Sequence, residues 1–299
     1  MTQIPPLQKN DTVAIVSTAR KISFDEIRPA IELLKFWNLN VKIGKSIGLE
    51  NHQFAGTDEE RTSDLQTMLD DPEIKAIWCA RGGYGTVRII DRLGFSNFKK
   101  KPKWIIGYSD VTVLHSQLNL LGFESLHAQM AHQIDQKSEA TRTTLKNILF
   151  GKPVSYEIPF SEMNKFGHVE GEFVGGNLSV LYSLLRSPSA ISTRNKVLFL
   201  EDLDEYLYHI DRMLQNLKRN GVFKNLNGLI IGGMSDMNDN QIPFGKTAEE
   251  IIWESVKEYD FPVCFGFPAG HVYDNQALVF GRKISMEITL EKTMVNYLE

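Results

Sequence analysis

Residue types suited to acyl transfer follow three hydrophobic runs of this 299-residue sequence. The run from Trp104 to Gly107 leads into Tyr-Ser-Asp, which places Ser109 on a tight corner before a helix-like stretch. Glu201 is the first polar residue after Leu198–Leu200, and His271 follows Phe-Gly-Phe-Pro-Ala-Gly. In this chain order, a serine, a carboxylate and a histidine suit a nucleophile, an orienting acid and a base.

The corner at Ser109 has two interpretations. A serine hydroxyl is a weak nucleophile, and it needs a base beside it and donors for the developing oxyanion. A strand-to-helix corner exposes the hydroxyl, and the backbone N–H of Asp110 is then the natural oxyanion donor. The alternative is that Ser109 or Asp110 caps the following helix. Because the stretch lacks the second glycine of Gly-x-Ser-x-Gly, by itself it favours the cap.

A glycine-rich turn, Arg81 to Gly85, follows another hydrophobic run. Its glycines let the backbone approach a ligand closely or adopt positive φ. One interpretation is a phosphate cradle, since we expect a helix to begin nearby. Nucleotide binding is disfavoured, because the turn matches neither Gly-x-Gly-x-x-Gly nor a Gly-Lys-Ser/Thr loop. A second oxyanion donor from Gly83 and a simple tight turn are the other two interpretations.

His271 is the favoured base among seven histidines because it lies just beyond the end of a strand. His115 lies six residues after Ser109 on the same expected helix, so it should face away from the hydroxyl. His127 and His132 lie in a loop-rich segment that could reach the site. No metal site is expected, since no His-Glu-x-x-His or similar ligand pair is present, and no cofactor is expected.

Composition argues against several classes of protein. The net charge is −4, and apolar and charged residues make up 42% and 23% of the chain, as in ordinary globular proteins. No dense basic run suggests nucleic acid, and no apolar run approaches the roughly 18 residues of a membrane span. The N-terminus lacks the pattern of a secretory signal. The only cysteines, Cys79 and Cys264, lie in apolar runs, so we expect no disulfides and a cytoplasmic location.

Strands and helices alternate through the first half, which predicts a mostly parallel sheet with helices on both faces. A helix is expected around 24–37, where Pro29 requires a late start or a kink. Thr57 and Glu60 form a capping-box pattern that predicts the next helix. Another helix is expected after the glycine-rich turn. The predicted strands here are 12–19, 40–47, 74–80 and 103–107.

The pattern changes around residues 151–169, where short alternating runs, prolines and glycines occur. We therefore expect an N-terminal α/β domain at 1–150, a linker at 151–169 and a C-terminal domain at 170–299. Ligands of open α/β sheets gather at the carboxyl ends of the strands. The catalytic candidates, which follow predicted strands, should meet at such an edge.

Five segments together resemble the serine L,D-carboxypeptidases, also called the muramoyltetrapeptide carboxypeptidase family. Relatives include self-immunity hydrolases that inactivate microcin-type peptide–nucleotide toxins. The resemblance implies a flavodoxin-like, doubly wound N-terminal domain joined to a smaller C-terminal β/α domain, commonly as a homodimer. The segments are "FAGTDEERTSDLQTMLDDPEIKAIWCARGGYG", "IIGYSDVTVLH", "EGEFVGGNLSVL", "LFLEDLDEYLYHIDRML" and "GFPAGH".

The resemblance also implies roles for individual residues. Ser109, Glu201 and His271 would form the catalytic triad. The backbone amides of Gly83 and Asp110 would bind the oxyanion. The residues expected to bind substrate are Arg81, Gly82 and Tyr84 of the glycine-rich turn, and Gly176 and Asn177 of the second domain.

The chain departs from the family pattern at two places. Ser17 to Arg20 stands where members often have a Ser-Pro or Pro-Ser-Ser element, and Glu172 stands where many carry a neutral or basic residue. Both changes lie near where substrate groups could bind, so they bear on the identity of the substrate and not on the reaction. Arg81 and Arg20 follow strand ends, and both are candidates for binding a terminal carboxylate, since arginine suits bidentate binding.

The expected function is that of a serine peptidase that releases terminal D-alanine from murein tetrapeptide in cell-wall recycling. Its partner would be a small peptide substrate, with neither nucleic acid nor membrane involved. A microcin-type immunity peptidase ranks lower, since no insertion is visible between Asn177 and Lys196. The alternative from another class is a non-catalytic α/β protein whose glycine turns hold a small anion.

Overall fold

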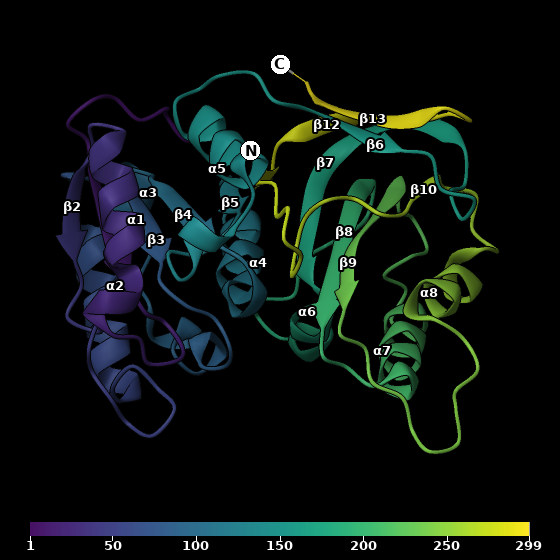
Figure 1. The fold of residues 1–299 in the computed structure, drawn as a ribbon, viewed down its shortest axis with the longest axis horizontal. Coiled ribbons are helices and arrows are strands. Elements are labelled where there is room, and N and C mark those ends of the chain that lie inside the picture. The colour runs from purple at the N-terminus through teal and green to yellow at the C-terminus, as the bar shows by residue number, and fades with distance from the viewer. Residues whose placement is uncertain (299) are drawn as a thin grey trace.

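The computed structural model describes residues 1–298 and consists of two α/β halves that lie side by side (Figure 1). The strands of the first half are β1 (Thr12–Val16), β2 (Asn40–Ile43), β3 (Ile74–Cys79), β4 (Trp104–Gly107) and β5 (Ser125–His127). Its helices are α1 (Phe24–Phe36), α2 (Asp58–Asp70), α3 (Ser96–Lys100), α4 (Thr112–Leu120) and α5 (Glu139–Leu149).

The sheet of the first half has the strand order of a flavodoxin. Its parallel strands lie in the order β5-β4-β3-β1-β2, so the connection changes direction beside β1 and β3. The strands β1, β3 and β4 are almost wholly buried and rich in Ile, Val, Trp and Ala, as strands covered on both faces must be, whereas the edge strand β2 has no buried residue. The predicted flavodoxin-like fold is confirmed.

The second half has a mixed sheet. Four parallel strands, β10-β9-β8-β7, continue into the antiparallel strands β12, β13 and β6. Their bounds are β6 (Ser155–Pro159), β7 (Gly167–Asn177), β8 (Lys196–Leu203), β9 (Gly228–Ser235), β10 (Val263–Cys264), β12 (Lys283–Ile288) and β13 (Lys292–Tyr297). The helices are α6 (Leu178–Leu184), α7 (Leu207–Arg219) and α8 (Ala248–Val256), and they lie below the sheet in Figure 1.

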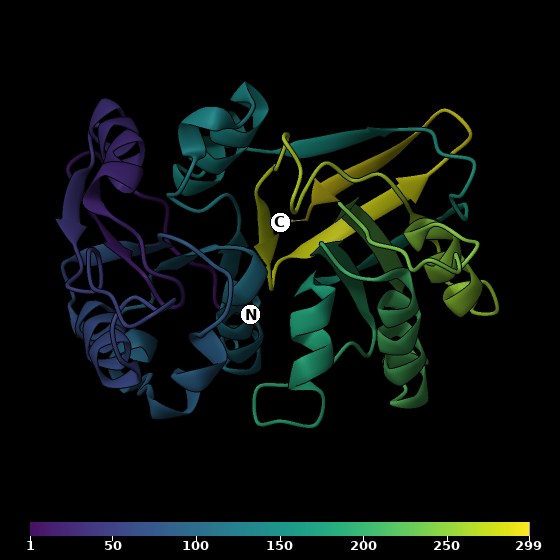
Figure 2. The ribbon, with the colours of Figure 1, turned by 60° about the horizontal axis from the view of Figure 1, so that its bottom comes forward.

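One strand joins the two halves. β11 (Leu278–Phe280) comes late in the chain, yet it pairs antiparallel with β5 in the N-terminal sheet. It lies near the middle of the molecule in Figure 2. Leu278 and Phe280 are buried in one apolar cluster with Phe173 and Phe199 of the second half. The halves therefore share a strand as well as an apolar contact.

The segment expected to be a linker, 151–169, contains a strand and the beginning of another. β6 lies wholly within it and pairs with β13, and β7 begins at Gly167. The alternation of exposed and buried residues in β6 explains this, because it gives the strand one face for the sheet. The division into 1–150, 151–169 and 170–299 stays a prediction.

The structure shows where the helices α1 and α2 begin, and these starts can be compared with the predicted ones. The capping box predicted from Thr57 and Glu60 is confirmed at the start of α2. α1 begins at Phe24 and continues through Pro29, so the late start, one of the two alternatives, is excluded and the kink stays a prediction. A second capping box, Ser23 with Glu26, satisfies the first N–H groups of α1. This cap fixes where the helix begins.

No α-helix begins directly at the glycine-rich turn, and the helix expected between this turn and β4 is the short α3, Ser96–Lys100. Two short 3-10 turns, Thr86–Arg88 and Ile90–Arg92, follow instead. The phosphate-cradle interpretation depended on a helix N-terminus at this place, so it loses its basis. Within residues 1–298, no helix is long and apolar enough to cross a membrane.

Candidate active site

The three catalytic candidates come from three different strand ends. Ser109 follows β4, Glu201 lies near the end of β8, and His271 lies in the loop between β10 and β11. β4 belongs to the N-terminal sheet and β8 to the C-terminal sheet. The site therefore lies where the two halves meet, and neither half holds it alone.

Ser109 occupies a strained corner. Its backbone has φ of +61°, a left-handed conformation that costs a non-glycine residue about 1–3 kcal/mol. The corner is tight, since a Cβ on Gly107 would lie 2.8 Å from the Val111 side chain. Neither the 3-10 turn Ser109–Val111 nor α4 has a side-chain cap. The helix-cap interpretation is therefore wrong, and the turn presents the Ser109 side chain as a nucleophile elbow does.

The side chain of Asp110 holds the glycine-rich turn. Its carboxylate is buried and accepts a hydrogen bond of 2.8 Å from the backbone N–H of Thr86. Burial raises the pKa of Asp110, and the hydrogen bonds from Thr86 and Gly85 only partly offset this effect. The nucleophile corner and the turn are thus fixed to each other.

The glycine-rich turn faces Ser109. A Cβ on Gly82 would lie 3.3 Å from the Ser109 Cβ and 3.4 Å from its Oγ. Gly83 has φ of +104°, which explains the need for glycine at this position. In the part of the chain that the structure describes, neither the Gly83 amide nor the Asp110 amide donates a hydrogen bond. Both amides are therefore free to bind an oxyanion.

Glu201 and His271 form a buried pair. The Glu201 carboxylate is fully buried, and its Oε2 lies 2.6 Å from His271 Nδ1 and 3.2 Å from the His271 backbone nitrogen. Gly270, with φ of +100°, makes room for the carboxylate, since a Cβ there would lie 2.7 Å from Oε2. The hydrogen bond directs Nδ1–H to Glu201 and leaves Nε2 as the basic nitrogen.

The electrostatics of His271 favour the imidazolium. Burial alone lowers the pKa of His271, but the charge of Glu201, its hydrogen bond and the charge of Asp202 together raise it above the ordinary value of 6.5. A base of this kind accepts a proton readily. It also stays protonated to a higher pH than a free histidine.

Tyr108, the neighbour of Ser109 in the chain, contacts the ring of His271. Its ring centroid lies 4.7 Å from that of His271. No hydrogen bond joins Ser109 Oγ to His271 in this structure. Catalytic hydrogen bonds of this type often shorten only when a substrate is bound. The structure thus places the three predicted residues in one region without a closed triad.

A buried polar network that the sequence did not predict lies next to the site. The Asn177 side chain donates to the Asp202 carboxylate at 2.8 Å, and the Asn177 backbone donates to Thr112 Oγ1 at 3.0 Å. Thr112 begins α4, three residues after Ser109, and Asn177 pairs with Glu201 between β7 and β8. Hydrogen bonds thus connect α4, which follows Ser109, to the strands β7 and β8 beside Glu201.

Two residues of the Gly-Gly-Asn segment, Gly176 and Asn177, have structural roles in this network. A Cβ on Gly176 would lie 2.5 Å from Thr112 Oγ1, so glycine allows the two halves to approach closely. The Asn177 side chain is buried and caps α6 through Val180. Burial and the adjacent Glu201 raise the pKa of Asp202 to about 7. The substrate-binding roles expected for Gly176 and Asn177 stay predictions.

The remaining predicted substrate residues lie around the glycine-rich turn. Arg81 pairs with Glu26 of α1 at 3.4 Å, and Tyr84 is half exposed, with its ring 6.1 Å from that of Phe54. Their roles stay predictions, as does that of Gly82. Among residues 1–298, no cluster of three or more His, Cys, Asp or Glu could hold a metal ion.

Two other histidines can be assigned from their surroundings. His115 is buried, and its ring nitrogens lie 2.9 Å from Ser125 Oγ and from the Gly107 carbonyl oxygen. His127 is fully buried among aromatic rings, and burial holds its pKa well below the ordinary value. Neither residue has a ring nitrogen at the surface. The third candidate, His132, lies beside Glu26, with 3.8 Å between His132 Nδ1 and Glu26 Oε1, and the role of His271 as the base stays a prediction.

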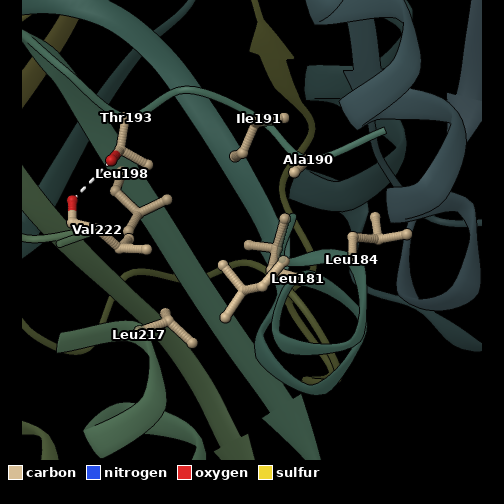
Figure 3. Close-up of a pocket in the computed structure, with 9 residues that line it drawn as sticks. Leu181, Leu184, Ala190, Ile191, Thr193, Leu198, Leu217 and Val222 are labelled. Carbon is tan, nitrogen blue, oxygen red and sulfur yellow. Dashed lines mark hydrogen bonds between the residues drawn. The ribbon is translucent and has the colours of Figure 1, made fainter. Parts of the chain in front are cut away.

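A small apolar cavity lies in the second half, away from the predicted site residues. Figure 3 shows aliphatic side chains of α6, α7, β8 and the loop before β8 around it. Its volume is about 20 Å³, which is room for about one water molecule. This cavity is a packing gap and is too small for a peptide.

An α/β protein with a serine on such a corner and a buried carboxylate–imidazole pair falls in the class of the hydrolases. Two domain families match the chain, the LD-carboxypeptidase N-terminal domain over residues 13–128 and the LD-carboxypeptidase C-terminal domain over residues 170–286. Together they cover most of the sequence. The chain therefore belongs to the LD-carboxypeptidase family, and it is a peptidase.

Individual relatives agree with this assignment. The chain is 35% identical, over 97% of its length and 92% of the relative, to a probable murein peptide carboxypeptidase of Bacillus subtilis. The crystal structure of muramoyltetrapeptide carboxypeptidase from Oxalobacter formigenes has a TM-score of 0.88 at 25% identity and covers 96% of this chain and 99% of that one. The microcin C7 self immunity protein MccF shares the fold, with a TM-score of 0.86 at 21% identity and 97% coverage of each chain.

Proposed function

We propose that this protein is a serine-type L,D-carboxypeptidase that releases the terminal D-alanine of murein tetrapeptide in cell-wall recycling. One observation carries the proposal. The Glu201–His271 pair and the strained Ser109 corner meet between the two halves, with the free amides of Gly83 and Asp110 beside the serine. The related muramoyltetrapeptide carboxypeptidase supplies the substrate class.

The geometry supports the following reaction. His271 Nε2 takes the hydroxyl proton of Ser109 as the oxygen attacks the carbonyl carbon, and it then returns the proton to the nitrogen of the leaving D-alanine. The Gly83 and Asp110 amides hold the oxyanion, an interaction typically worth about 3 kcal/mol per donor. Glu201 keeps the imidazole oriented and stabilises its charged form. Water then releases the acyl group through the same base.

The test compares the parent with Ser109→Ala, using purified murein tetrapeptide and measuring free D-alanine. We expect the substitution to abolish release while the unfolding midpoint stays close to that of the parent. Ser116→Ala is a matched control, since Ser116 is a buried serine of α4, the helix that follows the turn of Ser109. Release by Ser109→Ala at the parental rate would show that Ser109 is not the nucleophile.

The two alternative functions were microcin cleavage and non-catalytic anion binding. The likeness to MccF at 21% identity concerns the fold, and only α6 and one loop lie between β7 and β8, so no observation favours microcin cleavage over murein cleavage. The family assignment to a peptidase replaces the hypothesis of a non-catalytic anion-binding protein.

We also propose a cytoplasmic location and a homodimer. Both cysteines, Cys79 and Cys264, are free and buried, which suits a reducing compartment. The resemblance to a commonly dimeric family supports the second proposal. Sedimentation of the purified protein at micromolar concentration measures the oligomeric state. A monomer at this concentration would contradict the proposed homodimer.

A further inference from the structure

A carboxypeptidase must recognise a carboxylate at a fixed distance from the bond it cleaves. The terminal carboxylate belongs to the residue just beyond the scissile bond, so its carbon lies within about 4 Å of the carbonyl carbon under attack. The group that binds it must therefore lie close to the nucleophile and the oxyanion amides. A cation without another partner best suits this task.

The Arg20 side chain lies against the glycine-rich turn, which contains the Gly83 amide proposed for the oxyanion hole. A Cβ on Gly83 would lie 2.6 Å from Arg20 Cδ and 2.7 Å from its Nε, so the arginine stem crosses the bare glycine. The neighbouring Gly82 is the residue that faces Ser109. The arrangement sets a guanidinium next to the proposed oxyanion hole.

The backbone holds Arg20 in this place. The Arg20 amide bonds to the Gly82 carbonyl at 3.4 Å, and the Ser17 hydroxyl donates to the Arg20 carbonyl at 2.6 Å. Arg20 also forms an isolated bridge to Phe54. The segment after β1 is thus fixed to the glycine-rich turn, which limits where the side chain can go.

The guanidinium of Arg20 forms no ion pair within the described chain. No carboxylate between residues 1 and 298 lies within 4 Å of its guanidinium, and the residue is exposed. Arg81, the other arginine near the site, pairs with Glu26, whose Oε1 also lies 3.8 Å from His132 Nδ1. An incoming carboxylate meets a free cation at Arg20 and a neutralised one at Arg81.

We propose that Arg20 binds the terminal carboxylate of the substrate and so makes this peptidase a carboxypeptidase. The inference rests on the proposed function, because it assumes that Ser109 attacks the last peptide bond. It assigns to the Ser17–Arg20 segment, where the sequence departs from the family pattern, the recognition of the chain end. Arg20 then acts on specificity, whereas the triad acts on bond cleavage.

The experiment uses two substrates, murein tetrapeptide with a free C-terminal carboxylate and the same peptide with a C-terminal amide. Release of D-alanine or D-alaninamide is measured for the parent and for Arg20→Met. We expect the substitution to lower kcat/KM for the acid by about 10- to 100-fold, as loss of a charged hydrogen-bonding partner does. The rate for the amide should not change, which also shows that the variant is folded.

Three further variants make the outcome decisive. Lys21→Met removes the neighbouring positive charge, which pairs with Glu50, and it should leave both rates unchanged. Arg20→Lys keeps a charge without the planar fork and should give an intermediate rate for the acid. Loss of discrimination in Arg81→Met but not in Arg20→Met would overturn the inference, as would an undiminished preference for the acid in Arg20→Met. Absence of release from either substrate by the parent would instead refute the proposed function.

Discussion

The hydrogen bond between Asn177 and Thr112 is the contact most easily tested at the junction of the two halves. Thr112→Val keeps the shape of the side chain but replaces the oxygen that accepts the Asn177 N–H at 3.0 Å. Both residues are buried, with exposed fractions of 0% for Thr112 and 4% for Asn177, so water cannot replace the lost acceptor. Thr112→Ser keeps the acceptor and removes only a methyl group, which makes it the matched control.

The expected magnitude follows from that geometry. A buried donor left without an acceptor costs about 1–3 kcal/mol, which we expect as a loss of unfolding free energy in Thr112→Val. The valine methyl must also occupy the place where Thr112 Oγ1 closely approaches Gly176, so a shift of the junction is expected in addition. Because Thr112 begins the helix that follows Ser109, kcat should fall in the valine variant and stay near the parental value in the serine variant.

Three measurements check this reasoning. Urea unfolding at constant m value gives the change in stability, D-alanine release gives kcat, and amide hydrogen exchange gives the protection of the Asn177 N–H. We expect exchange at Asn177 to be slow in the parent and in Thr112→Ser and fast in Thr112→Val. Equal protection of Asn177 in the two variants would refute the assignment of this hydrogen bond.

Three further predictions concern the imidazole and its carboxylate partner. Because the pKa of His271 is raised above 6.5 and catalysis needs the neutral ring, kcat/KM should rise with pH through a value above 6.5. The charge of Asp202 contributes to that raised pKa, so Asp202→Asn should move the acid limb of the pH–rate profile to lower pH, and an unmoved limb would argue against the coupling. Gly270→Ala would place a Cβ 2.7 Å from Glu201 Oε2 and displace the carboxylate from His271. We expect kcat to fall about 100-fold, as misplacement by about 1 Å does, and a parental kcat would show that the pair tolerates the shift.

The sequence predicted the parts of the site that depend on a single strand. Ser109, Glu201 and His271 each follow a hydrophobic run, as the sequence shows. The expectation that they meet at the edge of one sheet is wrong, because the strands of Ser109 and Glu201 belong to two different sheets. The helix start at Thr57 was predictable for a similar reason, because a capping box is a local signal. These predictions needed only the identity of residues close together in the chain.

The contacts between distant segments were not predictable in this way. The Asp110 carboxylate could cap its own helix or reach Thr86, and only the folded chain shows that it bonds to Thr86. Asp202 is buried and accepts a hydrogen bond from the Asn177 side chain, a contact between two strands that no local pattern in the sequence indicates. In each case the hydrogen-bond partner of the aspartate lies in another element, and the residues next to the aspartate in the sequence do not indicate which one.

The place of β11 has a consequence for the order in which the protein is made. β5 ends at His127, and the strand that covers its open edge begins at Leu278, about 150 residues later. At roughly 5–20 residues per second, a ribosome reaches this strand about eight to thirty seconds afterwards. During that interval the N-terminal sheet has an unpaired edge, which can bind other strands. Nascent chains stalled before Leu278 should therefore be prone to associate through this edge, and release of the whole chain ends that risk.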